Sequence, residues 1–187
     1  MEEKTRAFIC IEFPESIIKE MARLQNLIEK HKFDGKLTEL ENLHLTLKFL
    51  GEVDNVTLEK VKERLSLVDF SEISLKLGEI GIFSHGKSPR IVWVKVLGEE
   101  VWRLQEKIDN ALEDLFKKEE RFMSHLTLAR VKYVKDREGF TEGVRKIGVK
   151  DIEFKINRFL LKKSDLRESG PIYTTIKEFG SSELKKQ

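Results

Sequence analysis

The feature that most constrains this chain is a tetrapeptide, His-Leu-Thr-Leu, that occurs twice, beginning at His44 and at His125. Each copy lies where apolar and polar residues alternate, which is the pattern of a β-strand with one buried face. His44 and Thr46 therefore share one face of their strand, and His125 and Thr127 share one face of theirs, with the leucines directed into the core. Any fold of this chain must present two equivalent pairs of imidazole and hydroxyl groups outside its core.

The elements predicted around the two copies follow the same order, strand–helix–strand–helix–strand. In the first half, residue spacing predicts strands at 6–13, 42–50 and 72–83 and helices at 15–31 and 54–68. In the second half it predicts strands at 90–97 and 122–131, one bent strand or two strands within 149–163, a strand at 172–179, and helices at 99–116 and 136–146. The first strands begin 84 residues apart and the histidines lie 81 residues apart, so we infer an internal duplication.

We predict an α+β fold built from duplicated β-α-β-α-β units. The chain is expected to form a single bilobal domain over residues 1–187, with one pseudo-repeat at about 1–88 and the other at about 89–187. Each lobe should hold a curved, mainly antiparallel sheet with its helices outside, and the active-site cleft should lie between the lobes. A doubly wound parallel sheet is the alternative, but the chain lacks the glycine-rich phosphate loop that such a fold would use.

Two histidines facing each other across a cleft suit in-line displacement at phosphorus. That reaction needs a base on one side and an acid on the other, and imidazole serves as either because its pKa lies near neutrality. The threonine hydroxyls can donate hydrogen bonds to the non-bridging phosphate oxygens. Purely structural histidines are the alternative, but packing gives no reason to keep histidine and threonine on the outward face of both copies.

Composition narrows the other possibilities. Cys10 is the only cysteine, which excludes a disulfide or a cysteine-based zinc site within one chain, and its strand context predicts a small buried side chain. We find no signal peptide or membrane-spanning segment, so we expect a soluble, cytoplasmic protein. The net charge is +2, but residues 1–116 carry −5 and residues 117–187 carry +7. The basic part could attract a polyanion, although an ordinary solvated surface gives the same pattern.

The paired motifs resemble the signature of the two-histidine (H-x-T-x) phosphoesterase superfamily, in the contexts HLTLKFLG at 44–51 and HLTLAR at 125–130. Two further features are RAFICIEFP near the start and a proline–arginine pair at 89–90 before a tryptophan-containing strand. Together they resemble the LigT-like RNA 2′,3′-cyclic phosphodiesterases, also called 2′-5′ RNA ligases, over nearly the whole chain. The paired motifs are more specific for the superfamily than for one substrate within it.

The resemblance implies metal-independent hydrolysis of the 2′,3′-cyclic phosphate at RNA ends, such as tRNA ends, to a 2′-phosphomonoester without a cofactor. It implies that His44 is the proton donor to the leaving 3′-oxygen and that His125 is the proton acceptor from water, although the sequence itself is symmetric on this point. If a 5′-hydroxyl replaces water, the chemistry run backwards gives reversible 2′-5′ RNA ligation. We expect a monomer whose partner is RNA, with neither a membrane nor a metal as partner.

Several nearby residues have two interpretations each. Arg130, two positions after the second motif, is expected to bind substrate through the phosphate or by stacking on a base, with a surface ion pair as the alternative. Alternation places Lys48 on the histidine face, as a solvent-facing lysine or one that lines the cleft, and Phe49 on the core face. Trp93 and Trp102 are expected to pack in the core.

The segment 84–90 is predicted to be a mobile, polar and basic loop that could grip RNA, with His85 as a candidate ligand. Three other functions stay open. A metal site at the two motif histidines lacks the closely spaced ligands that metals need. A non-catalytic RNA-binding module would not need a paired acid and base. The same chemistry could also act on a small cyclic nucleotide, a cyclic ADP-ribose phosphate or a 2′-5′ oligonucleotide.

Overall fold

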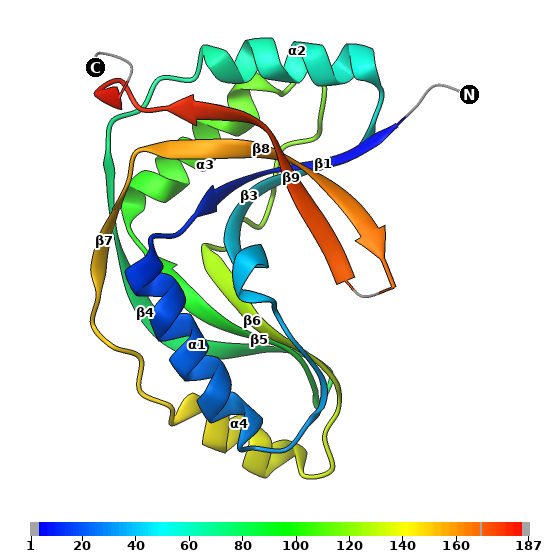
Figure 1. Cartoon of the computed structure of the whole chain (residues 1–187), viewed down its shortest axis with the longest axis vertical. Helices are drawn as coiled ribbons and strands as arrows, with labels where there is room; N and C mark the ends of the chain where they lie inside the picture. Colours follow the sequence, from blue (N-terminus) through cyan, green and yellow to red (C-terminus); the bar gives the residue numbers. More distant parts are fainter. Residues whose placement is uncertain (1–3, 169, 185–187) are drawn as a thin grey trace.

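The computed structural model describes residues 4–168 and 170–184 of the 187-residue chain. Within them, two antiparallel sheets are accompanied by four α-helices (Figure 1). The elements, in chain order, are β1 (Thr5–Glu12), α1 (Glu15–Glu29), β2 (Asp34–Leu37), the 3-10 helix η1 (Leu40–Asn42), β3 (His44–Val53), α2 (Asn55–Ser66), β4 (Ile73–His85), β5 (Ser88–Leu97), α3 (Glu99–Ala111), β6 (His125–Tyr133), α4 (Arg137–Arg145), β7 (Glu153–Ile156), β8 (Arg158–Arg167) and β9 (Gly170–Gly180). The predicted α+β class with two curved antiparallel sheets is confirmed.

The two sheets do not follow the two halves of the sequence. The first sheet has the strand order β3-β1-β8-β9, and the second has the order β2-β6-β5-β4-β7. The third strand of each predicted repeat therefore lies in the other repeat's sheet: β4 joins the second sheet and β8 joins the first. Helices cross over in the same way, because α1 packs beside β6 and α3 packs beside β3 (Figure 1). We propose a repeat boundary near residue 88, which falls at the β4–β5 hairpin.

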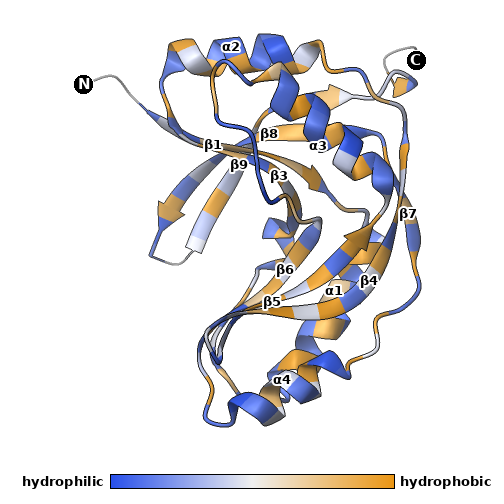
Figure 2. Cartoon of the chain, turned by 180° about the vertical axis from the view of Figure 1, so that it is seen from behind, coloured by the Kyte–Doolittle hydropathy of each residue, from blue (hydrophilic) through white to orange (hydrophobic). Residues whose placement is uncertain are grey.

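One large apolar core lies beneath both sheets, and Phe8, Cys10 and Leu160 form a small separate cluster. All four motif leucines, which are Leu45, Leu47, Leu126 and Leu128, are buried in the large core. Figure 2 shows hydrophobic and hydrophilic residues alternating along strands of both sheets, as expected for strands with one buried face. Burial of these leucines fixes which face of β3 and β6 remains free to carry the histidines.

Two of the helices start at aspartate caps. The Asp54 side chain accepts a hydrogen bond from the Thr57 amide at the start of α2, and Asp136 accepts one from the Gly139 amide at the start of α4. Such caps satisfy amides that have no partner within the helix. No helix within residues 4–168 and 170–184 combines the length and apolar character needed to cross a membrane.

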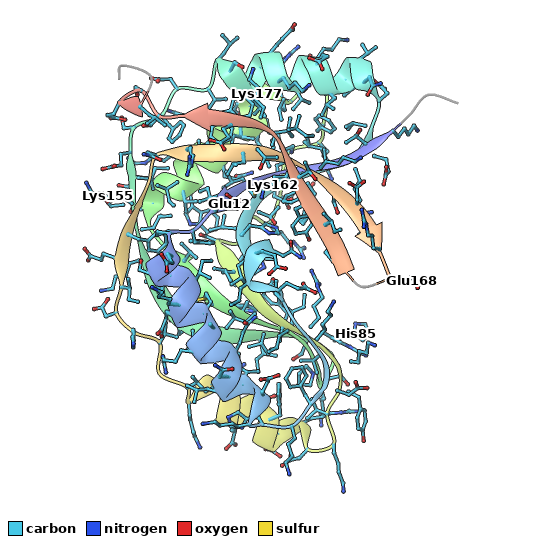
Figure 3. All side chains as sticks on the ribbon, in the orientation of Figure 1. Glu12, His85, Lys155, Lys162, Glu168 and Lys177 are labelled. Carbon is cyan, nitrogen blue, oxygen red and sulfur yellow. The ribbon has the colours of Figure 1, made fainter. Side chains whose placement is uncertain are left out.

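The segment 84–90 is not a loop, and that prediction was wrong. Strand β4 runs to His85 and β5 begins at Ser88, so only Gly86 and Lys87 form the turn, with Gly86 at φ +57°. The polar residues of this segment give no strand pattern, because the hairpin is held together by backbone hydrogen bonds. His85 is exposed at this tip, on the same side of the molecule as Glu168 at the β8–β9 turn (Figure 3). Strand β2 was also missed, since it is short, polar and paired only with β6.

Candidate active site

The two motif strands are built alike. Both β3 and β6 begin with the motif histidine, and in both the first four side chains alternate between half-buried and fully buried. Thr46 and Thr127 therefore share the faces of His44 and His125, as the sequence predicts. Although they belong to different sheets, β3 and β6 are neighbours in space. The fold thus brings the two imidazole–hydroxyl pairs to the place where the sheets meet.

A β-bulge follows each motif and reverses the alternation. In β3 the register with β1 shifts between Thr46 and Lys48, and in β6 the register with β5 shifts between Thr127 and Ala129. An extra residue in one strand turns every later side chain to the opposite face. Lys48 consequently points into the core and Phe49 points outward, so the predicted orientations of both were wrong.

The bulge gives Phe49 and Arg130 matching positions. Each is the third residue after its motif threonine, and each is exposed on the face that carries the histidine. Phe49 is 68% exposed and lies near Phe8 of the adjacent strand, with ring centroids 6.2 Å apart. Equivalent positions in the two lobes therefore present an aromatic ring in one and a guanidinium in the other.

Each catalytic candidate is fixed by a backbone carbonyl. Nδ1 of His44 lies 2.7 Å from the carbonyl oxygen of Asn42, and Nδ1 of His125 lies 2.7 Å from that of Met123. A carbonyl can only accept, so Nδ1 must carry the hydrogen and donate it. The other ring nitrogen, Nε2, is then the one that gains or loses a proton. Both histidines are oriented in the same way by the residue two positions earlier in the chain.

His44 lies in an aromatic environment. Its ring centroid is 4.9 Å from that of Phe8 on β1 and 5.2 Å from that of Tyr173 on β9. Burial lowers the pKa of His44 to about 4, because the charged imidazole is poorly solvated there. His44 is therefore neutral near pH 7 in the protein without substrate.

Three charged groups surround His44. Lys162 and Arg130 add to the lowering of the His44 pKa, while Glu12 opposes it. Arg130 belongs to β6 in the second sheet, which lies beside β3, so a charge from one motif strand acts on the histidine of the other. Glu12 is the register partner of His44 and forms an ion pair with Lys162, whose side chain is almost fully buried. Figure 3 labels this pair beside β1 and β8.

His125 packs against aromatic rings from neighbouring strands of its own sheet. Its ring centroid is 5.3 Å from Phe83 on β4 and 6.2 Å from Trp93 on β5. Trp93 is buried, as predicted, and Gly81 makes room for it, because a Cβ atom at that position would lie 2.1 Å from the indole ring. The aromatic wall therefore restricts how the second imidazole can turn.

A family model described as LigT-like phosphoesterase matches residues 11–93 and 94–173, which together make up most of the chain. The chain belongs to the LigT-like phosphoesterase family. It is 39% identical over 178 residues to a protein of Methanocaldococcus jannaschii named RNA 2′,3′-cyclic phosphodiesterase, covering 93% of this chain and 99% of the relative. It is 35% identical over 178 residues to a protein of the same name from Archaeoglobus fulgidus, with the same coverage of both chains.

Solved structures show the same fold. TT0787 of Thermus thermophilus matches this LigT-like chain with a TM-score of 0.80 and 26% identity, covering 94% of this chain and 97% of the other. The apo form of E. coli LigT matches with a TM-score of 0.74 and 21% identity, covering 96% of this chain and 98% of the other. These two proteins therefore share the fold of this chain.

A buried polar cluster lies beneath the first motif strand, β3, of this phosphoesterase. Lys48 donates to Asp109 of α3 at 2.5 Å and to the carbonyl of Lys117 at 2.7 Å. Asp109 also accepts from the Gln105 side chain and from the Glu119 amide. The cluster ties β3 to the segment that leads into β6, so it positions one motif strand relative to the other. Sequence alternation missed it because the bulge alone turns Lys48 inward.

Two further residues for which the sequence predicted burial are Cys10 and Trp102. Cys10 is buried as predicted, and burial raises the pKa of its thiol to about 12. Trp102 is not in the core, contrary to the prediction: it is 49% exposed and packs edge-on against Phe122 with ring centroids 4.9 Å apart. It lies on an outer face of α3 that the apolar spacing of that helix does not bury. Within residues 4–168 and 170–184, no group of three or more His, Cys, Asp or Glu side chains is arranged to hold a metal ion.

Glu12 and Lys162 are the site residues that sequence reasoning missed. Glu12 ends the first strand, where a charged residue is ordinary. Lys162 follows the apolar run Phe159–Leu161 within β8, and a lysine inside a strand so rich in buried residues was the available signal. Its partner could not be identified without knowing that β8 pairs with β1.

Proposed function

We propose that this chain hydrolyses the 2′,3′-cyclic phosphate at the 3′ end of an RNA to a 2′-phosphomonoester. The observation that carries the proposal is the matched pair of imidazoles, each held through Nδ1 by a backbone carbonyl so that Nε2 is free. Relatives named RNA 2′,3′-cyclic phosphodiesterase, at 33–39% identity over nine-tenths of the chain, support the choice of substrate.

The reaction is one in-line displacement. Nε2 of His125 takes a proton from water as the water oxygen forms a bond to phosphorus, and Nε2 of His44 gives a proton to the 3′-oxygen as its bond to phosphorus breaks. The Thr46 and Thr127 hydroxyls donate hydrogen bonds to the non-bridging phosphate oxygens and hold the phosphate between the imidazoles. The products are a 2′-phosphate and a 3′-hydroxyl, and each histidine is left in the protonation state with which the other began.

His44 must take up a proton from solvent when the substrate binds, before it can act as the acid. His44 is neutral near pH 7 in the free protein because its pKa is lowered to about 4. A phosphate anion beside Nε2 favours the imidazolium, so we expect binding to raise that pKa. Near pH 6, binding of a nucleoside 2′-phosphate should therefore take up more protons from a weakly buffered solution with wild type than with His44→Ala. Equal uptake by both proteins would contradict His44 as the donor and favour the reverse assignment of the two histidines.

Two residues on the motif faces suit the rest of the terminal nucleotide. Arg130 brings a positive charge close to His44, where the phosphate would lie, and a guanidinium can donate two hydrogen bonds to phosphate oxygens. Phe49 presents an exposed ring on the opposite strand, on which the terminal base can stack. Recognition of the terminal nucleotide is thus divided between a cation from β6 and an aromatic ring from β3.

The same groups support transfer of the phosphate to a second RNA. If the 5′-hydroxyl of a second RNA attacks in place of water, the product is a 2′-5′ phosphodiester with a free 3′-hydroxyl, and the cyclic ester supplies the energy. We propose this ligation as a secondary activity of a monomer that acts on RNA ends, tRNA ends included, in the cytoplasm. The ligation is reversible: when the 2′-5′ diester is cleaved back to the cyclic phosphate, His44 acts as the base and His125 as the acid.

The test uses an RNA oligonucleotide that ends in a 2′,3′-cyclic phosphate. Wild type, His44→Ala and His125→Ala are incubated with it in the presence of EDTA, and the product is identified as a 2′- or a 3′-phosphate. We expect the 2′-phosphate from wild type and a loss of about 10²–10⁴-fold in each variant, the usual contribution of a general acid or base. A 3′-phosphate would reverse the leaving oxygen, and a wild type that binds the RNA without turnover would contradict the proposal.

A further inference from the structure

A pocket lies beside the segment that leads into His125. It has a volume of about 180 Å³ and is formed where β5 ends and α3 begins. Its walls are the last residues of β5, the first turn of α3 with Trp102, and the Met123 and Ser124 segment that precedes β6. The proposed reaction uses none of these side chains.

The pocket is connected to the motif face through the residues around His125. Met123 contributes to the pocket wall, and its carbonyl oxygen holds Nδ1 of His125. Lys95, which also lines the pocket, is the register partner of His125. Paired residues share one face of a sheet, and Leu97 shares it too, two positions after Lys95. The pocket therefore continues the face on which His125 stands.

The lining suits a flat apolar group with a polar edge. Trp102 is 49% exposed and makes an edge contact with Phe122, so part of its ring is available for stacking. Ser124 is only 3% exposed, and its hydroxyl has no hydrogen-bond partner among the residues that the structure describes. An unpaired buried hydroxyl is costly unless a ligand completes its hydrogen bond.

The charges in the pocket do not suit a phosphate. Lys95 lies 3.8 Å from Glu79, and Glu99 lies 3.2 Å from Arg103, so the two charged lining residues have partners of opposite sign. An anion would meet no excess of positive charge there. A neutral heterocycle that stacks on an indole and forms one hydrogen bond to a hydroxyl fits this lining better.

We propose that this pocket binds a nucleobase of the RNA, that of the nucleotide preceding the cyclic end. This inference rests on the proposed function. A cyclic phosphate ends the chain, so the rest of the RNA extends only from the 5′ side of the terminal nucleoside. The terminal base has the exposed ring of Phe49, farther along the strand that begins with His44, and the pocket near His125 takes the next base. Longer substrates then gain a contact that a mononucleotide cannot make.

The test compares kcat/KM for a dinucleotide with that for a mononucleotide, both ending in a 2′,3′-cyclic phosphate. Loss of one stacked base is worth about 1–3 kcal/mol, so Trp102→Ala should lower the dinucleotide-to-mononucleotide ratio about 5- to 150-fold. Trp102→Phe, which keeps an aromatic ring, should retain most of the ratio. Tyr133→Ala removes an exposed aromatic side chain at the far end of β6 and should leave the ratio unchanged.

The outcomes separate this inference from the proposed function. Circular dichroism first establishes that each variant is folded. An unchanged ratio in folded Trp102→Ala, or an equal loss on both substrates, would overturn the nucleobase pocket while leaving the proposed reaction intact. A wild type that turns over neither substrate would contradict the proposed function and, with it, this inference. We also expect Ser124→Ala to lower the dinucleotide-to-mononucleotide ratio, by less than Trp102→Ala does. That result would place the edge of the base at the Ser124 hydroxyl.

Discussion

The two motif strands share an outward face but are supported differently from inside. Under β3, Lys48 forms a buried ion pair with Asp109, the eleventh residue of α3. Under β6, the residue matching Lys48 is Ala129, and support comes from Gln25, the eleventh residue of α1, whose amide donates to the carbonyls of Leu128 and Thr38. One half uses two charges where the other uses a neutral amide.

The difference shows what the duplicated architecture holds constant. Histidine, threonine, the bulge and the carbonyl that holds Nδ1 are the same in both lobes. The buried polar contacts beneath them differ, although each reaches a motif strand from the helix of the other repeat. Geometry at the reacting groups is therefore shared, while the means of supporting it differ between the lobes.

The largest expected effect comes from breaking the charged support. Lys48→Met leaves the Asp109 carboxylate buried without its cation, which destabilises a protein by about 3–5 kcal/mol. Urea unfolding would measure this loss. The double variant Lys48→Met/Asp109→Leu should regain much of the stability, because it removes both charges together. A single variant as stable as wild type would show that this ion pair does not support β3.

Substitutions at the two matched outward positions, Arg130 and Phe49, should affect different kinetic parameters. Arg130→Ala removes a charge-assisted contact worth about 1.5–3 kcal/mol, so kcat/KM should fall about 10- to 150-fold for every cyclic phosphate tested. Phe49→Ala should raise KM with less effect on kcat, since stacking binds substrate and transition state alike. Steady-state kinetics distinguish the two, and Arg145→Ala, at an exposed position on α4, serves as the control. Equal losses in kcat for both variants would contradict this division.

Burial of His44 should make stability depend on pH. The unfolded chain takes up a proton at the ordinary histidine pKa of 6.5, whereas the folded chain keeps His44 neutral until about pH 4. Stability should therefore be unaffected by this group above pH 6.5 and should fall as pH drops from 6.5 toward 4, by about 3 kcal/mol. Unfolding of wild type and His44→Asn across this range isolates the effect. Parallel curves for the two proteins would mean that burial does not lower this pKa.

The smallest expected effect is loss of the neutral support. Gln25→Leu removes the hydrogen bonds to the Leu128 and Thr38 carbonyls, and an unpaired buried acceptor costs about 1–3 kcal/mol, of which apolar packing by leucine should recover part. We expect a net loss of about 1 kcal/mol, well below that of Lys48→Met, in the same urea experiment. A loss as large as that of Lys48→Met would erase the contrast between the two lobes.

Local patterns predicted most of the fold. The helices and most strands follow from apolar spacing and from caps such as Asp54, which are properties of a few consecutive residues. The exchange of β4 and β8 between the sheets could not be predicted, because strand pairing joins residues far apart in the chain. Strand β2 was missed for the same reason, since its place depends on β6.

The site was predictable in part. The positions of the motif histidines and threonines on one strand face follow from alternation, and the structure places them so. Alternation failed at Lys48 and Phe49 because a bulge is set by the register with a neighbouring strand. Lys162 was missed because its neighbours His44 and Glu12 come from other strands.

The exchanged strands give the molecule the form of a fused dimer. A half-length chain ending near the β4–β5 turn would hold one histidine motif, but its last strand, β4, would lack both of its pairing partners, β5 and β7, which belong to the other half. Such a chain could complete its sheets only by exchanging strands and helices with a second copy, and only the pair would hold two motif histidines. In a symmetric pair of identical copies the two histidines would have identical surroundings. In one continuous chain the surroundings of each histidine can change independently, and those of His44 and His125 do differ.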